Sequence, residues 1–266
     1  MSHQDLWGGI KPVVGVIHLL PLPGSPRWAG SMKPVLARAL REAEALQEGG
    51  ADGVLVENFG DAPFFPREVP PETVAAMAVV VERVVESVSL PVGLNVLRND
   101  ASAALAVAAS TGARFIRVNV HTGSMFTDQG LLEGRAHDTL RLRRALGADV
   151  LILADVLVKH AVPPPGLSLE AAAADTWERG LADGLILTGR GTGLPVDPEH
   201  IQRARQDLPE EAPIWVGSGA TPQTASGLLQ AADGIIVGSA LQKGGRAGGG
   251  IAAPWVRAFM EALGRA

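Results

Sequence analysis

Short apolar runs alternate along the chain with longer amphipathic segments. The runs are nearly continuous in apolarity and rich in β-branched residues, which is typical of parallel strands buried on both faces. They cover residues 13–19, 53–59, 91–97, 115–120, 149–156, 184–189, 213–219 and 234–240. Between them, apolar residues recur at helical spacing in residues 34–49, 71–88, 102–111, 135–146, 168–179, 198–206 and 222–230.

Capping residues mark several of the expected helix ends. Asp197-Pro198 and Thr221-Pro222 each resemble an N-cap followed by proline at the first helical position. Gly49, Gly112 and Gly180 stand where helices are expected to end. A last apolar stripe, formed by Trp255, Val256, Phe259, Met260 and Leu263, predicts a final helix that covers the first and eighth strands.

The strand and helix order predicts an α/β protein built as a single (β/α)8 TIM barrel over residues 1–266. The strand starts run from residue 13 to residue 234, about 32 residues per unit, and no linker or change of composition divides the chain. An open, doubly wound sheet is the alternative. Such sheets usually have fewer strands and a glycine-rich turn after the first one, whereas here the first strand runs into HLLPLPG.

The absence of cysteine and the mildly negative net charge exclude several classes of function. The chain has no cysteine, so disulfides, iron–sulfur clusters, thiolate zinc sites and a cysteine nucleophile are excluded. The net charge is −5 and no block of Lys or Arg is present, which argues against nucleic acid and against an anionic membrane surface. The first residues lack the basic and apolar stretches of an export signal, and no segment resembles a membrane helix, so we expect a cytoplasmic protein.

Glycine turns after the last two strands predict a phosphate site. TIM barrels bind ligands at the carboxyl ends of their strands, and phosphate often lies beside the loops after strands seven and eight. Here those loops contain Gly217, Ser218, Gly219, Gly238 and Ser239, whose backbone N–H groups can approach an anion. Gly189, with residues 190–193, is a further candidate wall. The alternative is that these are only tight turns.

Polar residues at the other strand ends predict acid–base chemistry. The candidate catalytic residues are His18, Glu57, His121 and Asp155, and the candidate substrate-binding residues are Asn58, Asn95, Asn119, Asp128, Lys159, His160 and Thr188. Strand alternation places Glu57 and Asp155 on the inner side of the barrel. Two opposed carboxylates suit general acid–base work on a sugar-like substrate. The alternative is a pair of structural ion pairs, Glu57–Arg98 and Asp155–Lys159.

The four candidate catalytic residues also have the ligand chemistry of a divalent metal site. Because no HxH or HxxxH pair fixes a metal geometry, we predict no metal and no other cofactor. Three connections look too rich in special residues to be plain loops: residues 21–26, residues 121–130, where a lid would lie, and residues 159–166.

Several of these stretches resemble the BtpA/SgcQ family. The resemblance is carried by HLLPLPGSP within residues 15–26, by FTDQG at residues 126–130, and by residues 56–59, 117–119, 154–156 and 159–160. It implies a TIM barrel of the phosphate-binding type, the ribulose-phosphate-binding barrel. Cyanobacterial members are associated with photosystem I accumulation, and other members occur in sugar-metabolism settings.

Two functions follow as expectations. The first is an enzyme that acts on a phosphorylated sugar or on a phosphoribosyl or nucleoside compound, with isomerase, lyase or nucleosidase-like chemistry. The alternative is a non-catalytic biogenesis factor of the photosystem I type, because a fold does not imply an activity. The expected partner is a phosphorylated small molecule, with no nucleic acid and no integral membrane contact. A homo-oligomer is possible for a barrel.

Overall fold

A computed structural model describes residues 1–189 and 196–265 of the chain. In this part, eight parallel strands close into a barrel in the order β1-β11-β10-β9-β7-β4-β3-β2, which confirms the predicted TIM barrel. The strands are β1 (Val13–His18), β2 (Gly53–Glu57), β3 (Val92–Asn95), β4 (Phe115–Val118), β7 (Leu151–Val156), β9 (Gly184–Leu187), β10 (Ile214–Val216) and β11 (Gly234–Val237).

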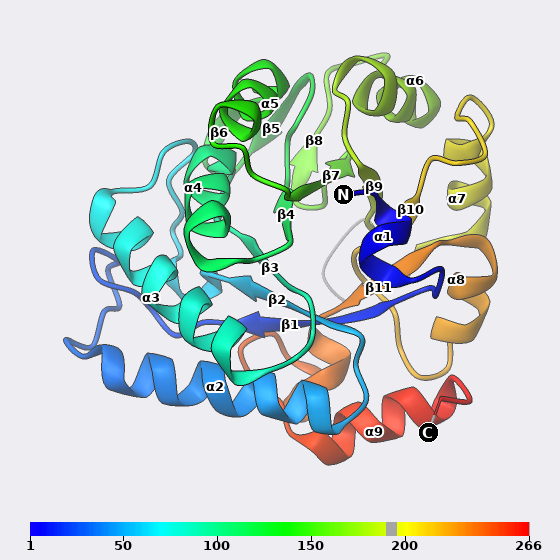
Figure 1. The fold of residues 1–266 in the computed structure, drawn as a ribbon. Helices are drawn as coiled ribbons and strands as arrows, with labels where there is room; N and C mark the ends of the chain where they lie inside the picture. The colour runs from blue at the N-terminus through cyan, green and yellow to red at the C-terminus, as the bar shows by residue number, and fades with distance from the viewer. Residues whose placement is uncertain (190–195, 266) are drawn as a thin grey trace.

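Helices surround the barrel, as Figure 1 shows. They are α2 (Met32–Glu48), α3 (Pro71–Ser87), α4 (Ala101–Thr111), α5 (Ala136–Ala145), α6 (Leu169–Ala174) with its π-helical continuation η2 (Asp175–Arg179), α7 (Pro198–Arg205), α8 (Ala225–Ala231) and α9 (Ala253–Ala262). Their apolar faces pack on the outside of the strands. None of the helices in the described ranges is long and apolar enough to cross a membrane.

Most of the predicted caps are confirmed, with one error. Asp197 accepts a hydrogen bond from the backbone of Glu199, and Gly112 ends α4 in the left-handed conformation. Thr221-Pro222 does not begin a helix. The hydroxyls of Thr221 and Thr224 each accept from the other residue's backbone N–H, which forms a turn and delays α8 to Ala225.

Large aromatic rings fill the barrel interior at the amino-terminal ends of the strands. Phe115 and Trp215 point inward and are fully buried. They fit because neighbouring strands carry glycine: a Cβ on Gly93 would lie 2.3 Å from the Phe115 ring, and one on Gly234 would lie 2.7 Å from the Trp215 ring. Gly93 and Gly234 are therefore needed for packing inside the barrel.

A short helix that the sequence did not reveal closes this end of the barrel. α1 (His3–Trp7) begins with a capping box formed by Ser2 and Asp5. Its Trp7 ring packs against Phe115 and Trp215, at centroid distances of 5.8 and 5.6 Å. Figure 1 shows α1 lying across the barrel end. With this end blocked, a ligand can enter the barrel only from the opposite end.

A small sheet replaces two of the predicted loops at the open end. β5 (Ser124–Thr127) and β6 (Gly130–Glu133) form an antiparallel hairpin, and β8 (Ala161–Val162) pairs with β5. The connections after β4 and β7 are therefore joined by backbone hydrogen bonds. Met125 and Leu132 anchor the hairpin on the buried side chains of Val120 and Val158.

The last helix is oriented as its pattern predicts. Val256, Phe259 and Met260 are buried, and α9 lies beside α2, as Figure 1 shows. Trp255 is the exception in the stripe, because 41% of its surface is exposed.

Candidate active site

The carboxyl ends of the barrel strands enclose a cavity of about 440 Å³. This size lies within the range of small-molecule sites. The sequence-predicted residues that line it are His18, Glu57, Asn119, Asp128, Lys159, His160, Gly217, Ser218, Gly219, Gly238 and Ser239. The structure thus brings the predicted phosphate turns and most of the predicted polar residues together around one space.

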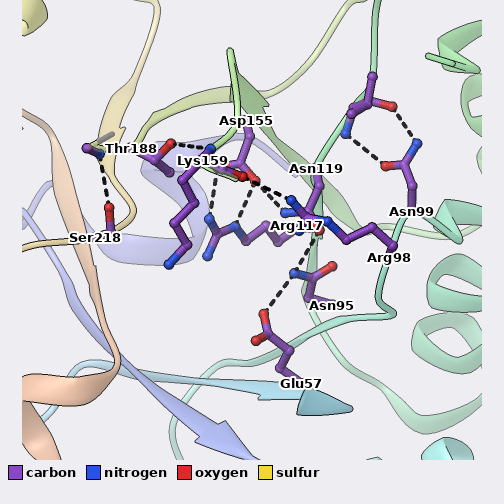
Figure 2. Close-up of polar contacts among 12 residues, drawn as sticks. Glu57, Asn95, Arg98, Asn99, Arg117, Asn119, Asp155, Lys159, Thr188 and Ser218 are labelled. Carbon is purple, nitrogen blue, oxygen red and sulfur yellow. Dashed lines mark hydrogen bonds and ion pairs between the residues drawn. The ribbon is translucent and has the colours of Figure 1, made fainter. Parts of the chain in front are cut away.

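Asp155 is engaged in a buried ion pair beneath the cavity. Arg117 donates to both of its oxygens, with Nη2–Oδ1 at 2.9 Å and Nε–Oδ2 at 3.0 Å, and Asn119 Nδ2 donates to Oδ2 at 2.6 Å (Figure 2). The Asp155 side chain has no exposed surface. Since both oxygens already accept hydrogen bonds, this carboxylate serves first to hold Arg117 and Asn119 in place.

Arg117 is the residue that the sequence analysis missed as part of the site. It lies in β4 between Phe115 and Asn119, and alternation along the strand places all three side chains inside the barrel. An arginine at an inward position of an otherwise apolar strand needs a buried partner. That signal was available in the sequence.

Neither of the ion pairs weighed from the sequence, Glu57–Arg98 and Asp155–Lys159, is formed within the described residues. Asp155 pairs with Arg117 instead, and Glu57 Oε2 accepts from Asn95 Nδ2 at 2.9 Å (Figure 2). The other Glu57 oxygen, Oε1, lies 3.7 Å from His18 Nε2. Within residues 1–189 and 196–265, Glu57 therefore presents to the cavity a carboxylate that has a single side-chain donor within 3 Å.

His18 ends β1 on the opposite side of Glu57 from Asn95. Burial lowers the pKa of its imidazole, and the Glu57 carboxylate acts in the opposite direction by raising it. The Phe59 ring packs on the His18 ring with a centroid distance of 4.4 Å. A neutral imidazole beside a carboxylate can donate or accept a proton near pH 7, depending on which nitrogen carries the hydrogen.

Besides Arg117, the side chains of Arg98 and Lys159 line the cavity. Arg98 Nη2 donates to the Lys159 backbone carbonyl at 3.0 Å. Burial lowers the pKa of the Lys159 ammonium, as does Arg117 nearby, against the carboxylates of Glu57 and Asp155. With Arg117, these side chains create a positively charged wall. A ligand that carries negative charge would offset the repulsion among them.

The glycine turns leave room on the other wall. A Cβ on Gly217 would clash with Ile186 Cγ2 and lie 3.2 Å from Arg117 Nη2, and one on Gly238 would lie 3.3 Å from His18 Cε1. Bare backbone therefore borders the cavity beside the Arg117 guanidinium and the His18 ring. Ser218 Oγ accepts from the backbone N–H of Gly189 at 3.0 Å, which joins the ends of β9 and β10. Residues 190–193, the remainder of the third predicted wall, lie outside the described residues.

Three of the predicted substrate-binding residues hold the framework together instead of lining the cavity. Asn58 bridges two loops, because its Oδ1 accepts from Leu97 N at 2.7 Å and its Nδ2 donates to Asp61. Asn95 supports Glu57. Thr188 accepts from the Lys159 backbone N–H at 3.0 Å and so positions that lysine (Figure 2).

The structure places His121 away from the other predicted catalytic residues. Its Nε2 lies 2.9 Å from the Gly180 carbonyl, so the ring points toward η2 and not into the cavity. Burial lowers the pKa of this imidazole. The cause is the end of the strand: β4 stops at Val118, so the alternation that directs Asn119 inward does not continue to His121, which opens the segment leading to the hairpin.

In residues 1–189 and 196–265, no group of three or more His, Asp and Glu side chains is arranged to hold a metal ion. His18 and Glu57 are the only two of the four suggested ligands that approach one another there. The predicted absence of a metal stays a prediction.

The family follows from sequence comparison. The model of the BtpA family matches residues 9–265. The chain belongs to the BtpA family. A relative from Synechocystis, the photosystem I biogenesis protein BtpA, is 53% identical over 95% of this chain and 88% of its own length. The resemblance inferred from the HLLPLPGSP and FTDQG stretches is thereby confirmed.

Solved structures confirm the fold class of this BtpA-family chain. N-(5′-phosphoribosyl)anthranilate isomerase from Pyrococcus furiosus aligns over 96% of this chain and 98% of its own, with a TM-score of 0.57 and 16% identity. Thiamine phosphate pyrophosphorylase from the same organism aligns over 97% and 98%, with a TM-score of 0.59 and 15% identity. At such identities the similarity concerns the barrel alone.

Proposed function

We propose that this BtpA-family barrel is an enzyme that binds a phosphorylated sugar or phosphoribosyl compound in its cavity and converts it by proton transfer at Glu57. One observation carries the proposal: a buried carboxylate faces a cavity that also has a cationic wall and two glycine turns. Burial of a carboxylate lowers the stability of the fold unless the charge is paired, so packing alone does not account for a glutamate at this position.

The binding half of the proposal rests on charge and shape. The turns at Ser218–Gly219 and Gly238–Ser239 bring backbone N–H groups beside the cavity, where barrel enzymes hold phosphate, whereas the Gly217 N–H already donates to the Leu187 carbonyl. Lys159 and Arg98 add positive charge to the same cavity. Its volume of about 440 Å³ exceeds that of a lone phosphate and suits a phosphorylated ring.

The chemical half rests on the difference between the two carboxylates. Asp155 is saturated by Arg117 and Asn119, whereas Glu57 has one supporting amide and an oxygen directed toward His18. Glu57 is therefore the group that exchanges a proton with the ligand, and Asp155 supports the cationic wall. Isomerase, lyase and nucleosidase-like reactions all need such a group beside a sugar carbon.

Binding is tested by isothermal titration calorimetry with ribose 5-phosphate, nucleoside monophosphates and inorganic phosphate. We expect a phosphorylated compound to bind and its unphosphorylated analogue to bind at least ~10-fold more weakly. Lys159→Met should weaken binding, and Lys33→Met, at an exposed position of α2, should not. If none of the ligands binds at millimolar concentration, the site assignment is wrong.

Turnover of the ligand found in this way tests the chemistry. Glu57→Gln should lower kcat by about 100-fold or more while ligand affinity is retained. The exposed Glu82→Gln is the matched control. Unchanged turnover in Glu57→Gln would remove Glu57 from the mechanism.

A non-catalytic assembly role is the second candidate, and the 53% identical photosystem I biogenesis protein favours it. It predicts that Glu57→Gln and Lys159→Met leave function intact in a host that lacks the endogenous protein. The enzyme proposal predicts that both substitutions abolish complementation.

A further inference from the structure

A buried glutamine contacts the His18 ring from behind. Gln242 follows the short helix η3 (Ser239–Leu241), and only 4% of its surface is exposed. Its Nε2 lies 2.7 Å from His18 Nδ1 and donates to the Val16 carbonyl at 3.2 Å, while its Oε1 accepts from Gly249 N at 3.0 Å. These three contacts use the whole amide group.

The backbone partners determine which way this amide points. The Val16 carbonyl can only accept a hydrogen bond, and the Gly249 N–H can only donate one. The amide NH2 must therefore face Val16 and His18, and the amide oxygen must face Gly249. A flipped amide would break both backbone contacts. Gln242 consequently donates to His18 Nδ1.

A second donor reaches the same ring nitrogen. The backbone N–H of Gly248 points at His18 Nδ1 at 3.3 Å. With two donors directed at it, Nδ1 has to be the unprotonated nitrogen of the neutral ring, so the hydrogen resides on Nε2. That nitrogen is the one 3.7 Å from Glu57 Oε1, on the cavity side.

The glycine-rich segment that supplies these contacts is itself fixed. Arg38 of α2 donates from Nη2 to the Gly248 carbonyl at 2.7 Å, and its Nε pairs with the buried Glu42 at 2.6 Å. The Phe59 ring restrains the imidazole from another side. The donors behind His18 are therefore held in place by an outer helix.

We propose that Gln242 is a positioning residue that locks His18 in the Nε2–H tautomer, so that His18 is a hydrogen-bond donor to the ligand and Glu57 is the proton acceptor. The tautomer follows from the contacts, whereas the role toward a ligand rests on the proposed function. As Glu57 takes a proton from the ligand, the freed electron pair moves onto a ligand oxygen. The Nε2–H of His18 stabilises the charge that develops there.

Nitrogen NMR of the ligand-free protein with 15N-labelled histidine tests the tautomer. At neutral pH we expect His18 to show an unprotonated Nδ1 and a protonated Nε2, with assignment from the signals that disappear in His18→Gln. A protonated Nδ1 in the neutral ring would overturn the proposal. Because no ligand is present, this result is independent of the proposed function.

Substitution of the glutamine tests its positioning role. In Gln242→Glu, a carboxylate replaces the donor, so we expect the hydrogen to move to Nδ1. In Gln242→Met, which introduces no charge, the two tautomers should become mixed. Gln202→Glu, exposed on α7, should leave the His18 spectrum unchanged. A wild-type His18 spectrum in both folded Gln242 variants would show that Gln242 does not set the tautomer.

A ligand titration tests separately whether the His18 Nε2–H contacts the ligand. Addition of ribose 5-phosphate, if the calorimetry shows binding, should shift the Nε2 resonance and leave the Nδ1 resonance nearly unchanged. A ligand that binds without altering Nε2 would remove His18 from contact with it, even if the tautomer is as proposed.

Discussion

At the residue scale, one buried carboxylate is structural and the other is available for chemistry. The sequence placed Glu57 and Asp155 alike, because both stand at inward positions near strand ends. Their difference comes from Arg117 on β4 and Asn119 just after it, whose side chains donate to Asp155 on the neighbouring strand β7. Strand pleat predicts which residues point inward but not which inward residues pair. That choice depends on strand order and register, which only the closed barrel fixes.

The Arg117–Asp155 pair should therefore contribute strongly to stability. In Asp155→Asn, Arg117 stays buried without its counter-charge, and we expect the free energy of unfolding to fall by about 3–5 kcal/mol. Urea denaturation measures it. Glu86→Gln, which breaks the exposed Arg83–Glu86 pair, should cost less than ~1 kcal/mol. An equal loss of unfolding free energy in the two variants would contradict a structural role for the Arg117–Asp155 pair.

Buried histidines should make the fold sensitive to acid. Burial lowers the pKa of His121 below its ordinary 6.5, so the unfolded chain binds a proton more readily than the folded one. The effect of His121 on the free energy of unfolding is therefore absent above pH 6.5, and the free energy of unfolding falls as the pH drops below that value. We expect His121→Gln to lose less stability than wild type between pH 7 and pH 5, and the exposed His137→Gln to behave as wild type. Identical pH slopes in all three proteins would refute this.

At the element scale, the continuous apolar runs and the helical periodicity predicted all eight barrel strands and the helices that follow them. What they did not predict are the short elements. The strands of the β5–β6 hairpin have four residues each, and only Met125 and Leu132 are buried in them, too few for a pattern. α1 has five residues, and its position depends on Trp7 meeting rings from β4 and β10.

The short helix α1 should matter more than its length suggests. Trp7 fills the closed end of the barrel, so Trp7→Ala should leave a cavity and lower the free energy of unfolding by about 3–5 kcal/mol. Trp255→Ala, the same change at a 41% exposed position of α9, is the control and should cost much less. Chemical denaturation compares them. A Trp7→Ala protein as stable as the control would mean that α1 is not part of the core.

At the scale of the whole molecule, one end of the barrel is filled and the other is open, charged and bordered by glycine. α1 and the aromatic rings occupy the first end, whereas the connections after the strands supply the polar groups of the second. Besides ending helices, as Gly112 does, glycine admits Phe115 and Trp215 in the core and leaves backbone accessible around the cavity.

A crystal structure of the protein with ribose 5-phosphate tests the proposed site most directly. We expect the phosphate between the turns at Gly219 and Ser239, with the sugar extending toward Glu57 and His18. Phosphate held elsewhere, or a sugar directed away from Glu57, would contradict it.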